Sequence, residues 1–335
     1  MVIGRNEGER LARCLRSLRG AEGAVVYVDS GSTDGSPGCA RDFGAAVIEL
    51  DASCPYSAAR GRNAGFEALA REHPQLAFIQ FVDGDCELVP GWLEAATQHL
   101  VAHPGVAVAC GRRRELHPEA SPWNRLADME WDTPLGDTDA CGGDALVRAV
   151  AFREVGGYDA SLIAGEEPEL CWRLGRAGWR IVRLDCEMTR HDAALERVSQ
   201  WWRRRARAGH AYAEAVWRHR RAPDPRRVRR LLSILFWAGL VPGAALLLLL
   251  PTRGASALLF AGWAWPFWRA YRDVRPRWQR RHAALWAATC VIGKLAELEG
   301  AAAFVWSRAV RRRATDLIEY KAPAASTRRG GPSGS

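Results

Sequence analysis

The chain has 335 residues, which is enough for a catalytic domain and a further segment. Hydrophobic residues make up 48% and charged residues 25% of it, and this composition excludes a largely disordered chain. The formal net charge of +9 suits an anionic partner such as nucleic acid, anionic lipid or a phosphorylated substrate. The nine cysteines are scattered without a C-x-x-C pair, which argues against a disulfide framework and a zinc site and favours reduced thiols in the cytosol.

The first 110 residues alternate short apolar runs with helical patterns. A buried strand ends near Ile3, and four apolar runs predict further strands at 24–28, 45–50, 77–82 and 106–110. Helices are predicted around 11–18 and over 57–72 and 92–103. This order predicts an α/β fold with a mainly parallel sheet and helices on both faces. Ligands of such sheets bind at the carboxyl ends of the strands.

Polar residues follow three of the predicted strands directly, and the most informative are Asp83-Gly84-Asp85. Two carboxylates separated by a glycine can hold a hard divalent cation, Mg²⁺ or Mn²⁺, and leave other positions open to water and phosphate. A cation placed there neutralises charge on a departing diphosphate. Asp-Gly is also ordinary turn chemistry, but its position at a strand end favours the metal interpretation.

The other two strand ends carry Asn6-Glu7 and Asp29. A carboxylate at Asp29 can accept a hydrogen bond from a base or a ribose, and the loop amides after it can approach phosphate. The serine, threonine and aspartate at 32–34 can equally cap the next helix, and both interpretations can hold together.

Residues 111–195 are less regular. Gly165-Glu166-Glu167 opens a helix-like run to Ala177, where acids in a first turn also favour the helix dipole. A strand over 180–184 then leads towards His191.

The composition changes after residue 195. Residues 196–230 form a helical stretch rich in Trp and Arg, and 231–250 are 20 residues without a charge, long enough to cross a bilayer core of roughly 30 Å. After a break at 251–254, residues 255–268 are apolar again. The stretch 283–306 holds three charges and predicts an interfacial or partly buried helix.

Arginines flank this apolar hairpin on both sides. They predict that both flanks face the cytoplasm at the inner membrane and that the turn at 251–254 lies outside. The expected division is therefore a catalytic domain at 1–195, a basic helical region at 196–230, a membrane hairpin with an interfacial helix at 231–312, and a disordered tail at 313–335.

Six short motifs occur in a fixed order. They are Ile3-Gly4-Arg5-Asn6-Glu7, the run Val-Asp-Ser-Gly-Ser-Thr-Asp-Gly-Ser at 28–36, Arg62-Asn63-Ala64-Gly65, Asp83-Gly84-Asp85, Val155-Gly156-Gly157-Tyr158-Asp159 and Gly165-Glu166-Glu167-Pro168-Glu169-Leu170. Together they resemble the family 2 glycosyltransferases with the GT-A fold, over roughly residues 1–205.

This resemblance implies a set of roles. Contacts to the nucleotide-sugar donor fall on Asn6, Glu7, Asp29, Arg62 and Asp83. The last Asp of the D-x-D motif, Asp85, holds Mg²⁺ or Mn²⁺, with Asp83 at the ribose or the metal and His191 as the candidate third ligand. The general base aligns with Glu167; the family usually has Glu-Asp at this pair, so Glu166 is an alternative.

Membrane-bound relatives carry a Gln-x-x-Arg-Trp motif that contacts the diphosphate. Here Gln200 and Arg203 are in register, and Arg204 replaces the Trp. The alternative is a helix that lies at the membrane interface through its Trp and Arg side chains.

The resemblance implies a metal-dependent, inverting glycosyltransferase. Its partners would be a nucleotide-sugar donor, the membrane and a hydroxyl acceptor, with a lipid-linked or envelope glycan favoured by the anchor. A metal-dependent nucleotidyltransferase is the alternative enzyme class. A basic membrane-binding or nucleic-acid-binding protein without catalysis does not explain the ordered acids, and no nucleic-acid partner is expected.

Overall fold

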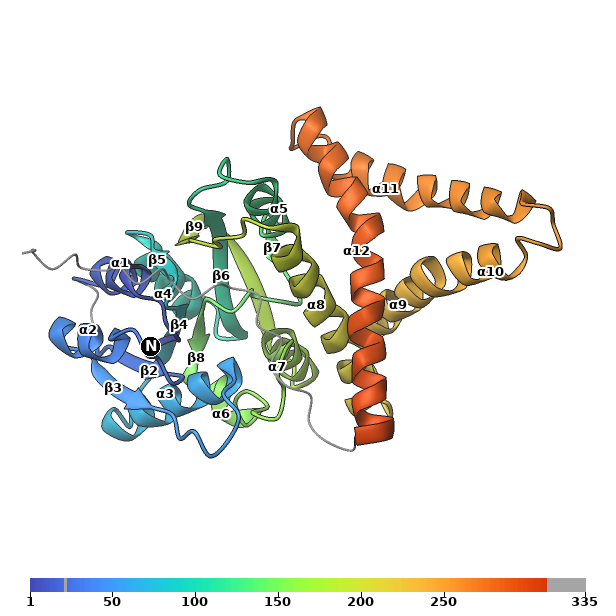
Figure 1. Cartoon of the computed structure of the whole chain (residues 1–335). Coiled ribbons are helices and arrows are strands. Elements are labelled where there is room, and N and C mark those ends of the chain that lie inside the picture. Colours follow the sequence, from blue (N-terminus) through green and yellow to red (C-terminus); the bar gives the residue numbers. More distant parts are fainter. Residues whose placement is uncertain (21–22, 312–335) are drawn as a thin grey trace, which may run out of the picture.

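The computed structural model describes residues 1–20 and 23–311, so the tail predicted at 313–335 lies outside the described residues. An α/β unit occupies the first part of the chain, and a helical part with a projecting arm follows it (Figure 1). This is the α/β unit expected from the sequence, followed by a candidate membrane segment near the C-terminus.

One mixed sheet forms the centre of the α/β unit. Its order is β3-β2-β1-β4-β8-β6-β9-β5, and β7 pairs with β9. The strands are β1 (Val2–Gly4), β2 (Val26–Asp29), β3 (Ala46–Glu49), β4 (Phe78–Asp83), β5 (Cys86–Leu88), β6 (Val106–Glu115), β7 (Gly136–Asp137), β8 (Ala145–Arg148) and β9 (Arg180–His191).

The strands β3, β2, β1 and β4 pair in parallel, as the alternation predicts. The later half differs, because β8 runs antiparallel to both β4 and β6. After β6 the chain passes through a helix at Pro122–Glu130 and through β7, which pairs with β9, before β8 enters the sheet between β4 and β6. The mainly parallel sheet of the prediction is therefore parallel in its N-terminal half and mixed beyond it.

Seven helices flank the sheet: α1 (Glu9–Ser17), α2 (Ser36–Phe43), α3 (Ala58–Glu72), α4 (Trp92–Ala102), α5 (Pro122–Glu130), α6 (Ala149–Glu154) and α7 (Glu166–Arg176). The side chain of Ser57 accepts a hydrogen bond from the amide of Arg60 at 3.2 Å, which caps α3 at its predicted start. Between α3 and the sheet, the rings of Phe66, Phe81, Phe152 and Tyr158 pack into one aromatic cluster.

The helical part starts with α8 (Val198–Arg218). It continues with α9 (Pro225–Ile234), η1 (Leu235–Leu240) and α10 (Val241–Leu247), returns through η2 (Ala255–Trp263) and α11 (Ala264–Val274), and ends with α12 (Arg280–Trp306) and η3 (Ser307–Arg311). Among the described residues, one helix is long and apolar enough to cross a membrane, Pro225–Leu247, and an 18-residue window within it has a mean hydropathy of 1.7. The uncharged run predicted at 231–250 begins inside this helix and extends past its end at Leu247. In Figure 1 the arm formed by α9, η1 and α10 projects away from the sheet, and the chain returns along α11.

α12 packs along α8, and the two backbones touch. A Cβ atom built on Gly300 would lie 1.8 Å from the carbonyl oxygen of Ala206, and one on Gly209 would lie 1.9 Å from that of Glu297. The side chain of Glu297 is fully buried and pairs with Arg205 and, at 2.9 Å, with Arg230. The predicted partly buried helix thus faces protein along its charged side.

Candidate active site

A cavity of about 860 Å³ opens at the carboxyl ends of β1 and β4 and is closed on other sides by α3, α7 and α8. It lies where a parallel sheet places its ligand. Most of the residues predicted to act on substrate line it, namely Asn6, Glu7, Arg62, Asp83, Asp85, Glu166 and Glu167.

Hydrogen bonds join the loops that follow β1 and β2. Asn6 has a positive φ of 55° and accepts a hydrogen bond at Oδ1 from the amide of Thr33 at 2.7 Å. The backbone amide of Asn6 donates to Ser32 Oγ at 2.9 Å. Asp29 is buried and accepts bonds from the hydroxyl of Tyr27 and from the amides of its own loop. Asp29 therefore shapes this edge of the cavity, and the lining residue beside it is Ser30.

Arg62 on α3 joins two carboxylates in the cavity wall. Its Nη2 lies 2.7 Å from Asp83 Oδ1, and its Nη1 lies 2.9 Å from Glu166 Oε1. Burial lowers the pKa of this guanidinium, but the charges of Asp83 and Glu166, with Tyr158 and the hydrogen bond to Glu166, together outweigh burial and raise the pKa well above its usual value. Arg62 therefore stays positively charged. Because Asp83 points towards Arg62, the roles of Asp83 and Asp85 differ.

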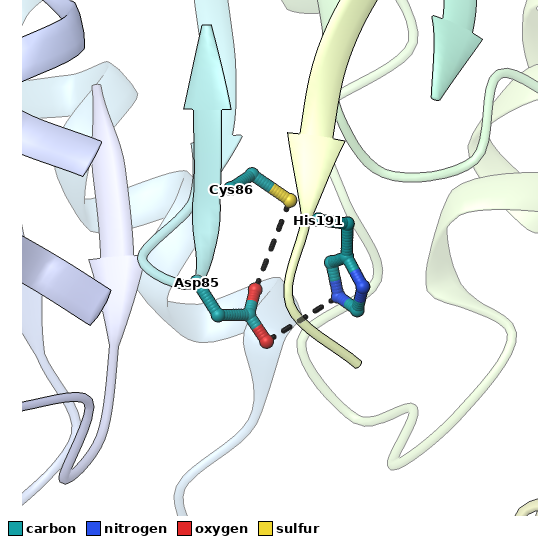
Figure 2. Close-up of side chains that lie close together, drawn as sticks. All are labelled: Asp85, Cys86 and His191. Carbon is teal, nitrogen blue, oxygen red and sulfur yellow. Dashed lines mark hydrogen bonds and ion pairs between the residues drawn. The ribbon is translucent and has the colours of Figure 1, made fainter. Parts of the chain in front are cut away.

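Asp85 instead faces His191 (Figure 2). Asp85 Oδ2 lies 3.3 Å from His191 Nε2, and Cys86 Sγ lies 3.8 Å from Asp85 Oδ1. The antiparallel pairing of β5 with β9 places Cys86 opposite His191, which brings this pair together across about 100 residues of sequence. Behind the ring, Glu115 Oε2 is 3.9 Å from His191 Nδ1.

The residues fit a divalent cation. Asp85 supplies a carboxylate oxygen and His191 an imidazole nitrogen, and Asp85 borders the cavity, where diphosphate and water could fill the remaining positions. Among the described residues His191 Nδ1 is buried without a hydrogen-bond partner, and the Glu115 carboxylate faces it, as is common behind metal-bound histidine. Burial raises the pKa of the Cys86 thiol well above its usual range, so Cys86 stays protonated and is no ligand for a hard cation.

The sequence analysis missed a buried ion pair beneath Asp83. Asp144 is fully buried, accepts a bond from the amide of Asp83 at 2.9 Å and pairs with Arg113 at 2.8 Å. Arg113 also lines the cavity and lies over the ring of Trp131, 5.5 Å from its centroid. The motif Cys141-Gly142-Gly143-Asp144 marks this acid in the sequence, whereas a buried arginine inside a strand has no comparable signal.

The two glutamates at the start of α7 have different surroundings. Gly165 caps the helix with a positive φ of 74°, and both side chains point towards the cavity. Glu166 is occupied by Arg62, whereas Glu167 accepts a hydrogen bond from the amide of Cys141 and lies 3.2 Å from Cys171 Sγ. Of the two glutamates, Glu167 is therefore the one that has no ion-pair partner among the described residues.

α8 closes the cavity with residues other than those predicted. Arg204, Arg207 and Tyr212 line it, whereas Arg203 is exposed and donates to Ser199 O. Gln200 is buried and its amide oxygen accepts bonds from the backbone at 196 and 197, which caps α8. Neither Gln200 nor Arg203 borders the cavity, so the geometry gives no support to their predicted contact with the diphosphate.

The sequence model of glycosyl transferase family 2 matches residues 1–155. A pre-mycofactocin glycosyltransferase of Mycobacterium tuberculosis is 31% identical over 229 residues, which cover 64% of this chain and 46% of that protein. The chain thus spans about half the length of this relative. The succinoglycan biosynthesis protein ExoA of Rhizobium meliloti is 26% identical over 314 residues, covering 81% of this chain and 94% of that protein.

A solved mannosyltransferase from Pyrobaculum calidifontis, in complex with GDP-Man and Mn²⁺, superposes with a TM-score of 0.57 at 17% identity. The superposition covers 92% of this chain and 87% of the mannosyltransferase, so the likeness of fold extends beyond the sheet. Since the family match covers β1 to α6 and includes the Asp83-Gly84-Asp85 motif, residues 1–155 form a glycosyl transferase family 2 domain, and the α/β unit has the GT-A fold.

Proposed function

We propose that this chain is a metal-dependent, inverting glycosyltransferase that moves a sugar from a nucleotide-sugar donor to a hydroxyl acceptor. The observation that carries the proposal is that three functional groups border one cavity: the Asp85 carboxylate, which contacts His191, the Arg62 guanidinium and the Glu167 carboxylate. The relatives in the two bacterial species and the solved GDP-Man complex support a sugar nucleotide as donor.

The donor's diphosphate belongs near Asp85 and Arg62. A bound Mg²⁺ or Mn²⁺ would neutralise the charge that develops on the leaving diphosphate. Arg62 and Arg113 are permanently cationic and buried, so they add a fixed positive potential to the same end of the cavity. Asp83, which pairs with Arg62, would hydrogen-bond a ribose hydroxyl or contact the metal.

Glu167 then acts as general base. It takes the proton of the acceptor hydroxyl while that oxygen bonds to the anomeric carbon, and the bond from this carbon to the diphosphate oxygen breaks. Attack opposite the leaving group inverts the anomeric configuration. Glu166 is less suited because its carboxylate is held in an ion pair with Arg62.

The acceptor side of the cavity is the wall formed by α8. Arg204, Arg207 and Tyr212 offer donors for a glycan or a phosphate there. Because the candidate span Pro225–Leu247 begins soon after α8, an acceptor bound at this wall would lie near the membrane. A lipid-linked or envelope glycan acceptor at the cytoplasmic face of the inner membrane fits this arrangement and the flanking arginines.

The test is a panel of sugar nucleotides with the full chain in detergent, with Mg²⁺ or Mn²⁺ and with a chelator. Release of a nucleoside diphosphate and a labelled glycosylated product supports the proposal. Transfer of the nucleotidyl group instead, with release of pyrophosphate, would establish the alternative nucleotidyltransferase. Full activity after exhaustive chelation would contradict the metal role of Asp85.

The base is tested with a matched pair of variants. Glu167→Gln keeps the size of the side chain and is expected to bind donor normally while lowering kcat by about 100-fold or more. Glu166→Gln breaks the ion pair with Arg62 and is expected to raise the KM for donor more than it lowers kcat. The reverse outcome would move the base to Glu166.

A further inference from the structure

Two thiols lie against Glu167, although they are 30 residues apart in the sequence. Cys141 Sγ and Cys171 Sγ are 3.8 Å apart, and Glu167 Oε1 is 3.2 Å from Cys171 Sγ. One ligand atom from each of the three residues lies within 4.8 Å of the other two, and all three residues are buried. The scattered cysteines of the sequence predicted no zinc site, but the fold assembles a pair that no short motif displays.

These distances match the edges of a coordination tetrahedron. A tetrahedral zinc ion with Zn–S bonds of about 2.3 Å holds two sulfurs about 3.8 Å apart. With a Zn–O bond of about 2.1 Å, a carboxylate oxygen lies about 3.6 Å from each sulfur, about 0.4 Å more than the distance from Glu167 Oε1 to Cys171 Sγ. The S–S distance and this O–S distance are therefore close to those of a tetrahedral site.

The fourth position is open. Cys141 and Glu167 both border the cavity, so an ion at this point can be reached from solvent and can keep a water molecule. Zinc is bound by thiolate and not by the protonated thiol. Binding then releases two protons, one from each thiol.

We propose that Cys141, Cys171 and Glu167 form a second metal site, which takes a thiophilic divalent cation such as Zn²⁺ and is separate from the Asp85–His191 site. Thiolates favour zinc over the hard cations Mg²⁺ and Mn²⁺, so the two sites select different metals. The inhibitory consequence rests on the proposed function: a zinc-bound Glu167 cannot accept the acceptor's proton, so zinc would block transfer.

The direct test is a titration of the full chain in detergent with Cd²⁺, in excess Mg²⁺ to fill the hard site. Cd²⁺ gives an ultraviolet charge-transfer absorption when it binds thiolate. We expect one Cd²⁺ per chain with this absorption. Cys141→Ser and Cys171→Ser should each weaken binding at least about 100-fold, since they remove a ligand and not merely an outer-shell partner.

Cys14→Ser is the matched control, because Cys14 is equally buried and belongs to no ligand group among the described residues. It should bind Cd²⁺ as the unaltered chain does. X-ray absorption at the zinc edge of the unaltered, zinc-loaded chain needs no substitution, so it decides the matter even if a serine variant misfolds. Two sulfur neighbours are expected, and a shell of only nitrogen and oxygen would overturn the site.

Activity separates this proposal from the proposed function. Zinc with two sulfur neighbours that also stops transfer supports both. Zinc with two sulfur neighbours and undiminished transfer would keep the site and remove Glu167 as base. Absence of sulfur ligation together with an inactive Glu167→Gln variant would overturn the site and leave the proposed function intact.

Discussion

The contact of α8 with α12 predicts the effect of one added methyl group. In Gly300→Ala the new Cβ would lie 1.8 Å from the carbonyl oxygen of Ala206, where an ordinary contact needs at least 3.4 Å. The oxygen belongs to a helix backbone and cannot rotate away, so the helices must separate by about 1.6 Å at this point. Strain and lost packing together should cost at least about 3 kcal/mol, because a gap of even 1 Å forfeits up to about half of each dispersion contact.

The assay is thermal unfolding in detergent followed by a measurement of transfer. A loss of 3 kcal/mol corresponds to a fall in Tm of about 6–12 °C. Because α8 carries Arg207 and Tyr212 into the cavity, its displacement should also lower kcat/KM, by about 100-fold for a shift of the order of 1 Å.

Gly38→Ala on α2 is the control. Nothing lies within 4 Å of a Cβ at this exposed helical position. Alanine should therefore raise the free energy of unfolding by about 0.5–1 kcal/mol, because it reduces the conformational entropy of the unfolded chain. If Gly300→Ala melts within about 1 °C of the unaltered chain and transfers sugar at the same rate, the close backbone contact does not exist in solution and the reasoning fails.

Three further outcomes follow from single side chains. Glu115→Gln should weaken Mn²⁺ binding about 10–100-fold in calorimetry without donor, because its carboxylate faces the histidine ligand; equal affinity would show that the ring is held otherwise. Arg62→Lys cannot bridge two carboxylates and should raise the KM for donor about 10–100-fold in initial-rate measurements. Burial lowers the pKa of His210 to about 4 from 6.5, so the unfolded chain binds a proton that the folded chain rejects. The contribution of His210 to the free energy of unfolding should therefore be fully present above pH 6.5 and be lost as the pH falls towards 4. In His210→Gln, the urea midpoint of unfolding should fall less steeply over this pH range than in the unaltered chain.

The strand ends were predictable from the sequence because their signal is local. A buried apolar run followed at once by acids or amides identifies the carboxyl end of a strand, and parallel strands bring those ends together. Asn6, Glu7, Asp83 and Asp85 meet in the cavity for this reason. The difference between Asp83, which turns to Arg62, and Asp85, which turns to His191, depends on strand pairing that the sequence does not display.

The wall formed by α8 was less predictable because the helix turns by about 100° per residue. Three consecutive arginines at 203–205 therefore face three directions: solvent, the cavity and Glu297. Pattern matching placed Arg203 at the donor, but the buried contacts of α12 fix the rotation so that Arg204 faces the cavity. The long-range partners that decide this rotation lie about 90 residues away in sequence.

Glu297 joins the cavity wall to the candidate membrane helix. Its buried carboxylate pairs with Arg205, one residue after cavity-lining Arg204, and with Arg230, which lies within the helix Pro225–Leu247. Moving both helices away from α12 would leave the buried charge of Glu297 without a partner, at a cost of about 3–5 kcal/mol. The lower-energy arrangement keeps all three helices together, so the orientation of the apolar arm and the position of the acceptor wall are set by the same contact.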